Sequence, residues 1–231
     1  MIDDKSHIIL NKANLELYLK YVCGKLNADF SAENTTNAQL LNLLEVSLTD
    51  KNGSSAREQV IAHMLDYQWQ SKKLGIDAID LKHNRYKEIK PTSNSKMGKA
   101  SSLRFNFNDV TRESIHKYEH TDIVVALFQN CRLIIVLEFP FSVIEKYFNS
   151  RVEKMFTDIK HQNKRKTMNI GAKEYISSPH LKVHYIDKEL ILAYNSITKK
   201  NLAIIENATN YVNIHTTELL EHKIQFEESI G

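Results

Sequence analysis

The chain has 231 residues, of which 42% are hydrophobic and 26% are charged, values typical of a soluble globular protein. It contains only 6 glycines and 3 prolines, about 4% of the residues against a usual share of roughly 12%. This scarcity argues against collagen-like proteins, flexible linkers, all-β sandwiches and glycine-rich phosphate-binding loops.

The basic residues concentrate in the middle of the chain. Residues 61–180 carry a net charge of +7, whereas residues 1–60 and 181–231 carry −2 each. The overall charge of +3 therefore conceals a basic central region. Such a region indicates a polyanionic partner.

The cysteines and the beginning of the chain predict a soluble, cytoplasmic protein. Cys23 and Cys131 show no metal-binding spacing and are expected to be reduced, buried thiols. The first residues lack the basic and apolar regions of a signal peptide. No apolar run approaches the roughly 18 residues of a membrane span.

The first part of the chain is predicted to be helical. Apolar residues recur at steps of three and four over residues 15–26 and 40–48. A third helix is expected over residues 55–73, where Ser55 and Glu58 have the spacing of a capping box.

Strands are expected after Gly75. Residues 76–81 are predicted to form a strand, residues 82–85 a turn, and residues 86–90 a second strand that ends at Pro91, because proline cannot donate to a ladder. The later expected elements are a loop at 92–102, a strand at 103–108, a short helix at 111–119, a buried hairpin of 123–128 and 133–139, a helix at 143–159, strands at 181–187 and 190–195, and a helical region from 201.

This order predicts an α/β (α+β) fold with a central mixed sheet and flanking helices. We expect one domain over residues 1–231, with a helical N-terminal subregion at 1–53, a core at 54–160, and C-terminal strands and a helix at 161–231.

The most informative segment for chemistry is residues 75–91. Glu88 and Lys90 are two positions apart on a predicted strand, so their side chains leave the same face. A tight turn joins this strand to one that carries Asp77 and Asp80, which can bring a second carboxylate to a shared metal ion. Mg²⁺ (magnesium) prefers carboxylate, water and phosphate oxygens. A nearby lysine can orient the attacking water and stabilise negative charge.

These residues resemble the PD-(D/E)xK nuclease superfamily, and especially its type II restriction endonucleases. Asp77 is followed eleven positions later by Glu88 and then by Lys90, with Glu58 on an upstream helix, and the resemblance covers about residues 55–140. It implies a nuclease core that uses Mg²⁺ to hydrolyse phosphodiester bonds in double-stranded DNA. It also implies that Asp77 and Glu88 bind the metal, that Lys90 positions the water, and that Glu58 assists.

Two assignments stay open at the level of sequence. Asp80 competes with Asp77 as the first metal ligand, although the spacing of 11 between Asp77 and Glu88 suits two strands joined by a turn better than the spacing of 8 from Asp80. The capping box alone also explains Glu58. Ile76 stands where the family motif often has proline.

Basic and polar side chains around this motif are candidates for DNA contact. Residues 82–104 carry seven basic residues and one acid, and no acid lies between Lys160 and Lys173. Arginine suits guanine and asparagine suits adenine in the major groove, although such stretches are also typical of solvated surfaces. The candidates are Lys82, Arg85, Ser93, Asn94, Lys96, Lys99, Arg104, Asn106, Asn108, Arg112, Lys164, Arg165 and Lys166.

Three functions are therefore considered. The first is a type II restriction endonuclease, for which a twofold-symmetric homodimer would cut both strands of a palindromic site. The second is a repair or phage nuclease of the same superfamily that recognises DNA structure. The third is a DNA-binding module in which Glu88 and Lys90 are surface residues without a catalytic role.

Overall fold

The computed structural model describes residues 10–23, 54–70, 76–94, 103–129, 131–157 and 165–208. Its elements in chain order are α1 (Lys12–Val22), α3 (Ser54–Met64), β1 (Gln68–Trp69), β2 (Ala78–Asp80), β3 (Arg85–Asn94), β4 (Phe105–Val110), α4 (Ser114–Lys117), β5 (Thr121–Gln129), β6 (Arg132–Pro140), α5 (Ser142–Met155), β7 (Lys166–Ile170), the 3₁₀ helix η3 (Ala172–Glu174), β8 (Lys182–Ile186), α6 (Lys188–Tyr194) and α7 (Lys199–Glu206).

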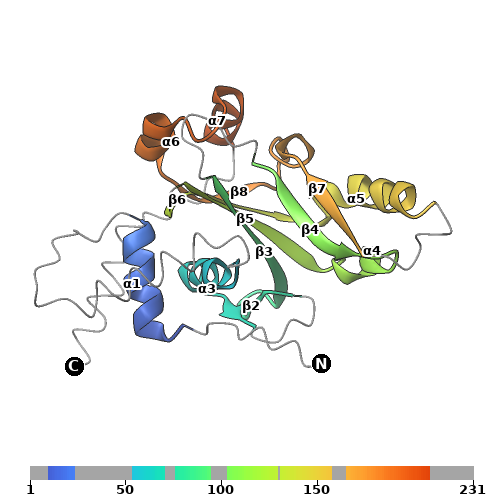
Figure 1. Cartoon of the computed structure of the whole chain (residues 1–231), viewed down its shortest axis with the longest axis horizontal. Helices are drawn as coiled ribbons and strands as arrows, with labels where there is room; N and C mark the ends of the chain where they lie inside the picture. The colour runs from blue at the N-terminus through green and yellow to red at the C-terminus, as the bar shows by residue number, and fades with distance from the viewer. Residues whose placement is uncertain are drawn as a thin grey trace, which may run out of the picture.

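A six-stranded mixed sheet forms the centre of the fold, with the strand order β1-β2-β3-β5-β6-β8 (Figure 1). β3 and β5 are parallel, and the other neighbouring strands are antiparallel. β5 is buried along its whole length and β6 at all but its two ends, as continuous apolar runs predict for central strands. The expected α/β class and the buried hairpin are confirmed.

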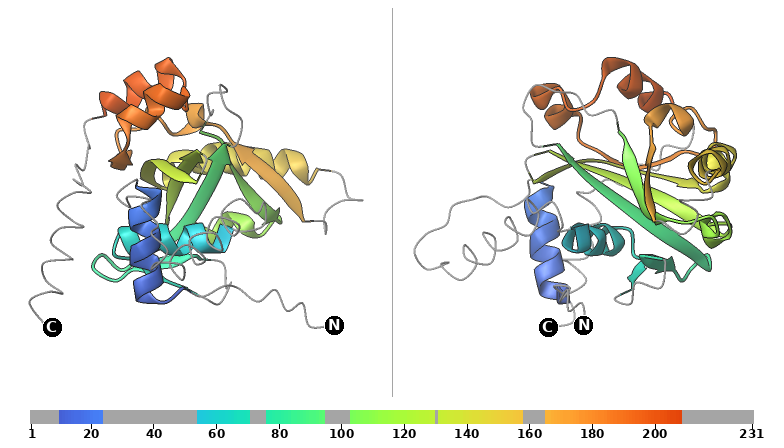
Figure 2. Two further views of the ribbon diagram at one scale, coloured as in Figure 1. Left: turned by 60° about the vertical axis from the view of Figure 1, so that its left-hand side comes forward. Right: turned by 45° about the vertical axis from the view of Figure 1, so that its right-hand side comes forward.

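The two faces of this sheet are covered by different elements. α1 and α3 lie against one face, and the two-stranded sheet of β4 and β7 lies with α5 against the other (Figures 1 and 2). Because successive strand residues face opposite ways, Val124 packs with α1 and α3, whereas Ile123 packs with β4, β7 and α5. Residues on the two faces of β3 therefore have separate surroundings.

The prediction that Pro91 ends the second strand is wrong, because β3 continues to Asn94. The last pair between β2 and β3 joins Ala78 to Lys87. Pro91 lies beyond that pair, and its nitrogen points the same way as that of Ile89, toward the side that β2 has left. A proline there costs the ladder no hydrogen bond.

The prediction of a strand at residues 190–195 is also wrong, because α6 occupies this segment. Asp187 caps the helix by accepting a hydrogen bond from the Leu190 N–H at 2.9 Å. Asn195 ends it in the left-handed conformation, with φ 48°. A short apolar run does not by itself distinguish a strand from a buried helix.

The helix expected over residues 55–73 is shorter in the structure. α3 ends at Met64, and Trp69 lies in β1. The helix predicted at 40–48 and the chain after residue 208 lie outside the described residues.

Cys23 and Cys131 are buried and form no disulfide, as expected. Within the described ranges, every helix is too short or too polar to cross a lipid bilayer.

Candidate active site

The structure brings Asp77, Glu88 and Lys90 together where β2 meets β3. Asp77 directly precedes β2, and its N–H donates to the Lys87 carbonyl at 3.0 Å. Glu88 and Lys90 leave the same face of β3, and Lys90 Nζ donates to Glu88 Oε1 at 2.5 Å. Lys90 Nζ also lies 5.2 Å from the centre of the Phe107 ring, on β4. The group therefore lies on the face covered by β4 and β7.

The position of Asp77 is held by the backbone of β3. Its Oδ2 accepts the Ile89 N–H at 2.8 Å, a donor that the shorter strand β2 leaves without a ladder partner. The Asp77 carboxylate therefore satisfies a backbone donor of β3. It also interacts electrostatically with Glu88 and Lys90.

Carboxylates outnumber cations in this group. Burial raises the pKa of Asp77 to about 8, and repulsion from Glu88 adds to the rise, while Lys90 lowers the pKa and Glu58 raises it further. Burial lowers the pKa of Lys90, but attraction by Glu88 and Asp77 outweighs it and leaves this pKa above its ordinary value. A proton on Asp77 or a bound cation would relieve the repulsion.

Glu58, on α3, interacts electrostatically with this group. Its side chain is buried, and its negative charge raises the pKa of both Asp77 and Lys90. α3 begins at Ser54, so Ser55 lies inside the helix, where its Oγ is 3.5 Å from the Gln59 side-chain amide. The structure thus places Glu58 near the candidate site.

Asp77 and Glu88 can supply oxygen ligands for a hard divalent cation. Within the described ranges, no three His, Cys, Asp or Glu side chains converge closely enough to hold a metal ion on their own. Mg²⁺ needs fewer, because it keeps several waters and binds through one or two carboxylates together with substrate phosphate oxygens. The raised pKa of Asp77 also fits a cation site, since a metal can replace the proton.

Asp80, the other candidate for the first metal ligand, lies in a different cluster. Its Oδ2 is 2.9 Å from His83 Nδ1 and 3.5 Å from Lys87 Nζ. Asp80 and Lys87 face away from Glu88 and Lys90, because Lys87 alternates with them along β3. The geometry therefore favours Asp77 over Asp80 at the candidate site.

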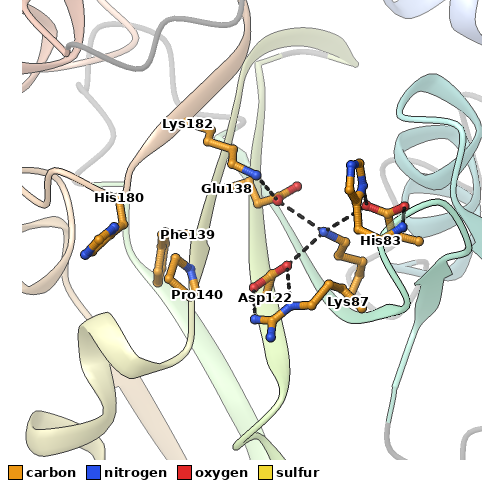
Figure 3. Close-up of a pocket in the computed structure, with 10 residues that line it drawn as sticks. His83, Lys87, Asp122, Glu138, Phe139, Pro140, His180 and Lys182 are labelled. Atoms are coloured by element: carbon orange, nitrogen blue, oxygen red, sulfur yellow. Dashed lines mark hydrogen bonds and ion pairs between the residues drawn. The ribbon is translucent and has the colours of Figure 1, made fainter.

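The cluster around Asp80 lines a cavity of about 590 Å³, here called the charged cavity (Figure 3). Lys87 Nζ lies at its base, 2.9 Å from Asp122 and 3.1 Å from Glu138. Burial raises the pKa of Glu138, but His184 and Lys87 outweigh it and hold this pKa below its ordinary range. The lining residues are Asp80, His83, Arg85, Lys87, Asp122, Glu138, Phe139, Pro140, His180 and Lys182.

Sequence reasoning missed the charged cavity. One signal was present: Glu138 is the only charged residue between Leu133 and Phe139, an otherwise apolar run. A charge at a central strand position requires a partner. The partner, Lys87, lies 51 positions earlier in the chain.

Three DNA-binding candidates share one surface. Arg104, Asn106 and Asn108 are exposed in or just before β4 and alternate with the buried Phe105 and Phe107. β7, which sequence reasoning did not predict as a strand, pairs with β4 and adds exposed side chains on the same side. We call this surface the ribbon face; it consists of Arg104, Asn106, Asn108, Arg165, Thr167 and Asn169.

Four basic candidates already have partners, among them Arg165 of the ribbon face, which forms an ion pair with Asp109 at 3.9 Å. Lys82 forms an ion pair with Asp66 at 2.7 Å, and Arg85 forms one with Asp122 at 2.5 Å. Lys166 donates to the Met155 carbonyl, which gives it a structural role.

The remaining candidates are only partly described. Ser93 and Arg112 are exposed, and Asn94 is the last residue of β3. Lys96, Lys99 and Lys164 lie outside the described residues.

Comparisons with known proteins do not identify a family: no family model and no curated protein matches the chain.

Proposed function

We propose that this protein is a Mg²⁺-dependent endonuclease that hydrolyses phosphodiester bonds in double-stranded DNA at a short specific sequence, as a type II restriction endonuclease does. The observation that carries this proposal is the meeting of Asp77, Glu88 and Lys90 beside Glu58. Burial and the neighbouring carboxylates raise the pKa of Asp77 to about 8. This site has carboxylate oxygens for a divalent cation and an ammonium group beside them.

Each of these side chains has a role in the proposed reaction. Asp77 and Glu88 would hold Mg²⁺, which when bound polarises the phosphate and lowers the pKa of a water molecule. Lys90 Nζ has three N–H donors and gives one to Glu88. The others can orient the attacking water and stabilise the charge that develops on the phosphate oxygens.

The ribbon face supports the choice of a DNA duplex as substrate. A two-stranded ribbon fits the major groove, where arginine pairs with guanine and asparagine with adenine. Asparagine is depleted in strands, yet Asn106 and Asn169 are exposed and directly opposite each other in the ladder. The buried face of the ribbon contacts Lys90 through Phe107, so the ribbon lies beside the candidate site while its exposed residues point away from Lys90.

A cleavage assay tests the proposal. The purified protein is incubated with plasmid and phage DNA in Mg²⁺ or EDTA, and the products are separated on a gel. Discrete fragments that require Mg²⁺ are expected, and a homodimer would cut both strands of a palindromic site. Nicking at junctions or a smear would favour a structure-specific nuclease, and intact DNA under all conditions would favour a non-catalytic DNA-binding module.

Variants connect the activity to the site. Glu88→Ala and Lys90→Ala should each abolish cleavage and leave DNA binding intact, whereas Lys199→Ala, at an exposed lysine on α7, should cut normally. Full cleavage by either site variant would reject the assignment. Asp77→Asn and Asp80→Asn, compared in parallel, identify the aspartate that binds the metal.

A further inference from the structure

The carboxylates of the charged cavity are already saturated with donors from the protein. Glu138 accepts hydrogen bonds from Tyr67 at 2.6 Å and Lys87 at 3.1 Å, and its other close partner is His184 at 3.1 Å. Asp122 accepts from Arg85 and Lys87. The cavity therefore has little acceptor capacity left for a cation.

Asp80 is satisfied in the same way. Its Oδ1 accepts the backbone N–H groups of Lys82 at 3.1 Å and His83 at 3.2 Å, and its Oδ2 contacts the His83 ring. The side chains of the three acids are only 8%, 10% and 2% exposed for Asp80, Asp122 and Glu138. Solvent in the cavity therefore meets little of the negative charge.

The basic side chains that line the cavity are more exposed than its acids. The exposed fractions are 37% for Arg85, 51% for Lys182 and 74% for His83. Lys182 Nζ has a single contact among the described residues, with Glu138 at 3.4 Å, so most of its donor capacity remains. The accessible wall is rich in N–H donors.

These donors surround the cavity from several sides. Figure 3 shows Lys182 and His180 on one side of the Lys87 ammonium, with the His180 ring turned away from it, and His83 on the other side. His180 is exposed, and its ring has no hydrogen-bond partner in the part of the chain that the structure describes. An oxyanion placed between these side chains could accept from more than one of them.

We propose that the charged cavity binds a phosphate group, and that this phosphate belongs to the backbone of the DNA. Its assignment to DNA rests on the proposed function. Lys87 and Glu88 are consecutive on β3 and face opposite ways, so the cavity and the candidate active site lie on the two sides of one strand. The cavity lies at the end of the sheet where β3, β5 and β8 begin and β6 ends, so a duplex passing over this end would bring a backbone phosphate to it.

The first test measures DNA affinity against salt concentration. A labelled duplex of mixed sequence is titrated with protein in Ca²⁺, which replaces Mg²⁺ so that the DNA stays uncut. Lys182→Gln should weaken binding by about tenfold and lower the slope of log affinity against log salt by about one. Lys199→Gln, the matched control on α7, should change neither quantity. An unchanged melting temperature checks that Lys182→Gln folds normally.

The second test uses inorganic phosphate and needs no DNA. Phosphate should shift the ring C–H resonances of His83 and His180 in a saturable way, and Lys182→Gln should weaken that response. The two resonances are assigned with His83→Asn and His180→Asn variants.

The combined results decide between the sources of phosphate. A reduced salt slope together with histidine shifts supports the proposal. Histidine shifts with unchanged DNA binding would mean a free phosphate ligand and would overturn the assignment to DNA, and the absence of both effects would overturn the site. If the natural protein neither binds nor cuts DNA, the proposed function fails, while the phosphate titration still tests whether the cavity binds an anion.

Discussion

Asp77 Oδ2 accepts the backbone N–H of Ile89 at 2.8 Å, so a carboxylate occupies the place where a neighbouring strand would continue the ladder. This bond keeps a half-buried acid beside Glu88 and Glu58, whose charges raise its pKa. The fold thus holds together groups that repel one another in the absence of a cation. The first two predictions depend on this repulsion.

Asp77→Asn should stabilise the metal-free protein. Folding raises the pKa of Asp77 from 3.8 to about 8, mainly through burial. An acid with a raised pKa contributes stability that is fully present below the unfolded pKa and is lost as the pH rises through the folded pKa. At pH 7 in EDTA, the variant should gain on the order of 1–3 kcal/mol in unfolding free energy. Urea unfolding between pH 4 and pH 8 measures this gain, which should shrink toward pH 4.

The control for this experiment is Glu153→Gln, at an exposed site on α5, where no gain is expected. If Asp77→Asn gained the same unfolding free energy at all pH values, the gain would not come from the charge of Asp77.

Mg²⁺ should stabilise the natural protein, because it offsets the repulsion between Asp77 and Glu88. A ligand that binds only the folded state adds about 2.7 kcal/mol at 100 times its Kd. The effect should increase from pH 6 to pH 8 as Asp77 loses its proton. Thermal unfolding with increasing MgCl₂, against NaCl of equal ionic strength, measures it. Asp77→Asn and Glu88→Gln should lose most of the shift.

Lys87→Met should destabilise the protein by about 3–5 kcal/mol, since it leaves buried carboxylates without their shared cation. The matched variant Lys82→Met breaks the ion pair with Asp66, in which both side chains are exposed, and should cost at most about 1 kcal/mol. Urea unfolding compares the two variants. Equal costs would mean that the buried cluster contributes no more than a surface pair.

Asn106→Ala and Asn169→Ala should relax the cleavage specificity without weakening the fold. Loss of one base contact typically costs about 1–3 kcal/mol of discrimination, so the preference for the recognition sequence should fall by roughly 10- to 100-fold. Fragment patterns and cleavage rates on matched and mismatched duplexes measure this loss. Asn201→Ala, on α7, is the control. Unchanged specificity in both ribbon variants would exclude the ribbon face from base recognition.

The meeting of Asp77, Glu88 and Lys90 could be predicted because it depends on local rules. Two strands joined by a tight turn bring their residues into register, and the period of two places Glu88 and Lys90 on one face. The apolar runs of β5 and β6 likewise predict a buried hairpin, because few other structures accommodate them.

Structure formed by distant segments could not be predicted in this way. β7 has little apolar alternation of its own, and it becomes a strand because Met168 and Ile170 pair with Phe107 and Phe105 of β4. The charged cavity takes side chains from strands between β2 and β8, so it exists only once the strand order is known. The prediction of a strand at residues 190–195 was wrong for a different reason. The side chain of Asp187 caps the N-terminus of this segment and favours a helix.

The ammonium group of Lys87 connects three strands of the sheet through ion pairs. Its partners Asp80, Asp122 and Glu138 come from β2, β5 and β6, so detaching β2 would remove the longest of these three ion pairs, at 3.5 Å, and leave the other two. We therefore expect the amides of β2, a three-residue strand near the edge of the sheet, to exchange with solvent more slowly in the natural protein than in Lys87→Met. The hairpin that carries Asp77 and Glu88 would then keep its geometry at temperatures where such a short strand would ordinarily fray.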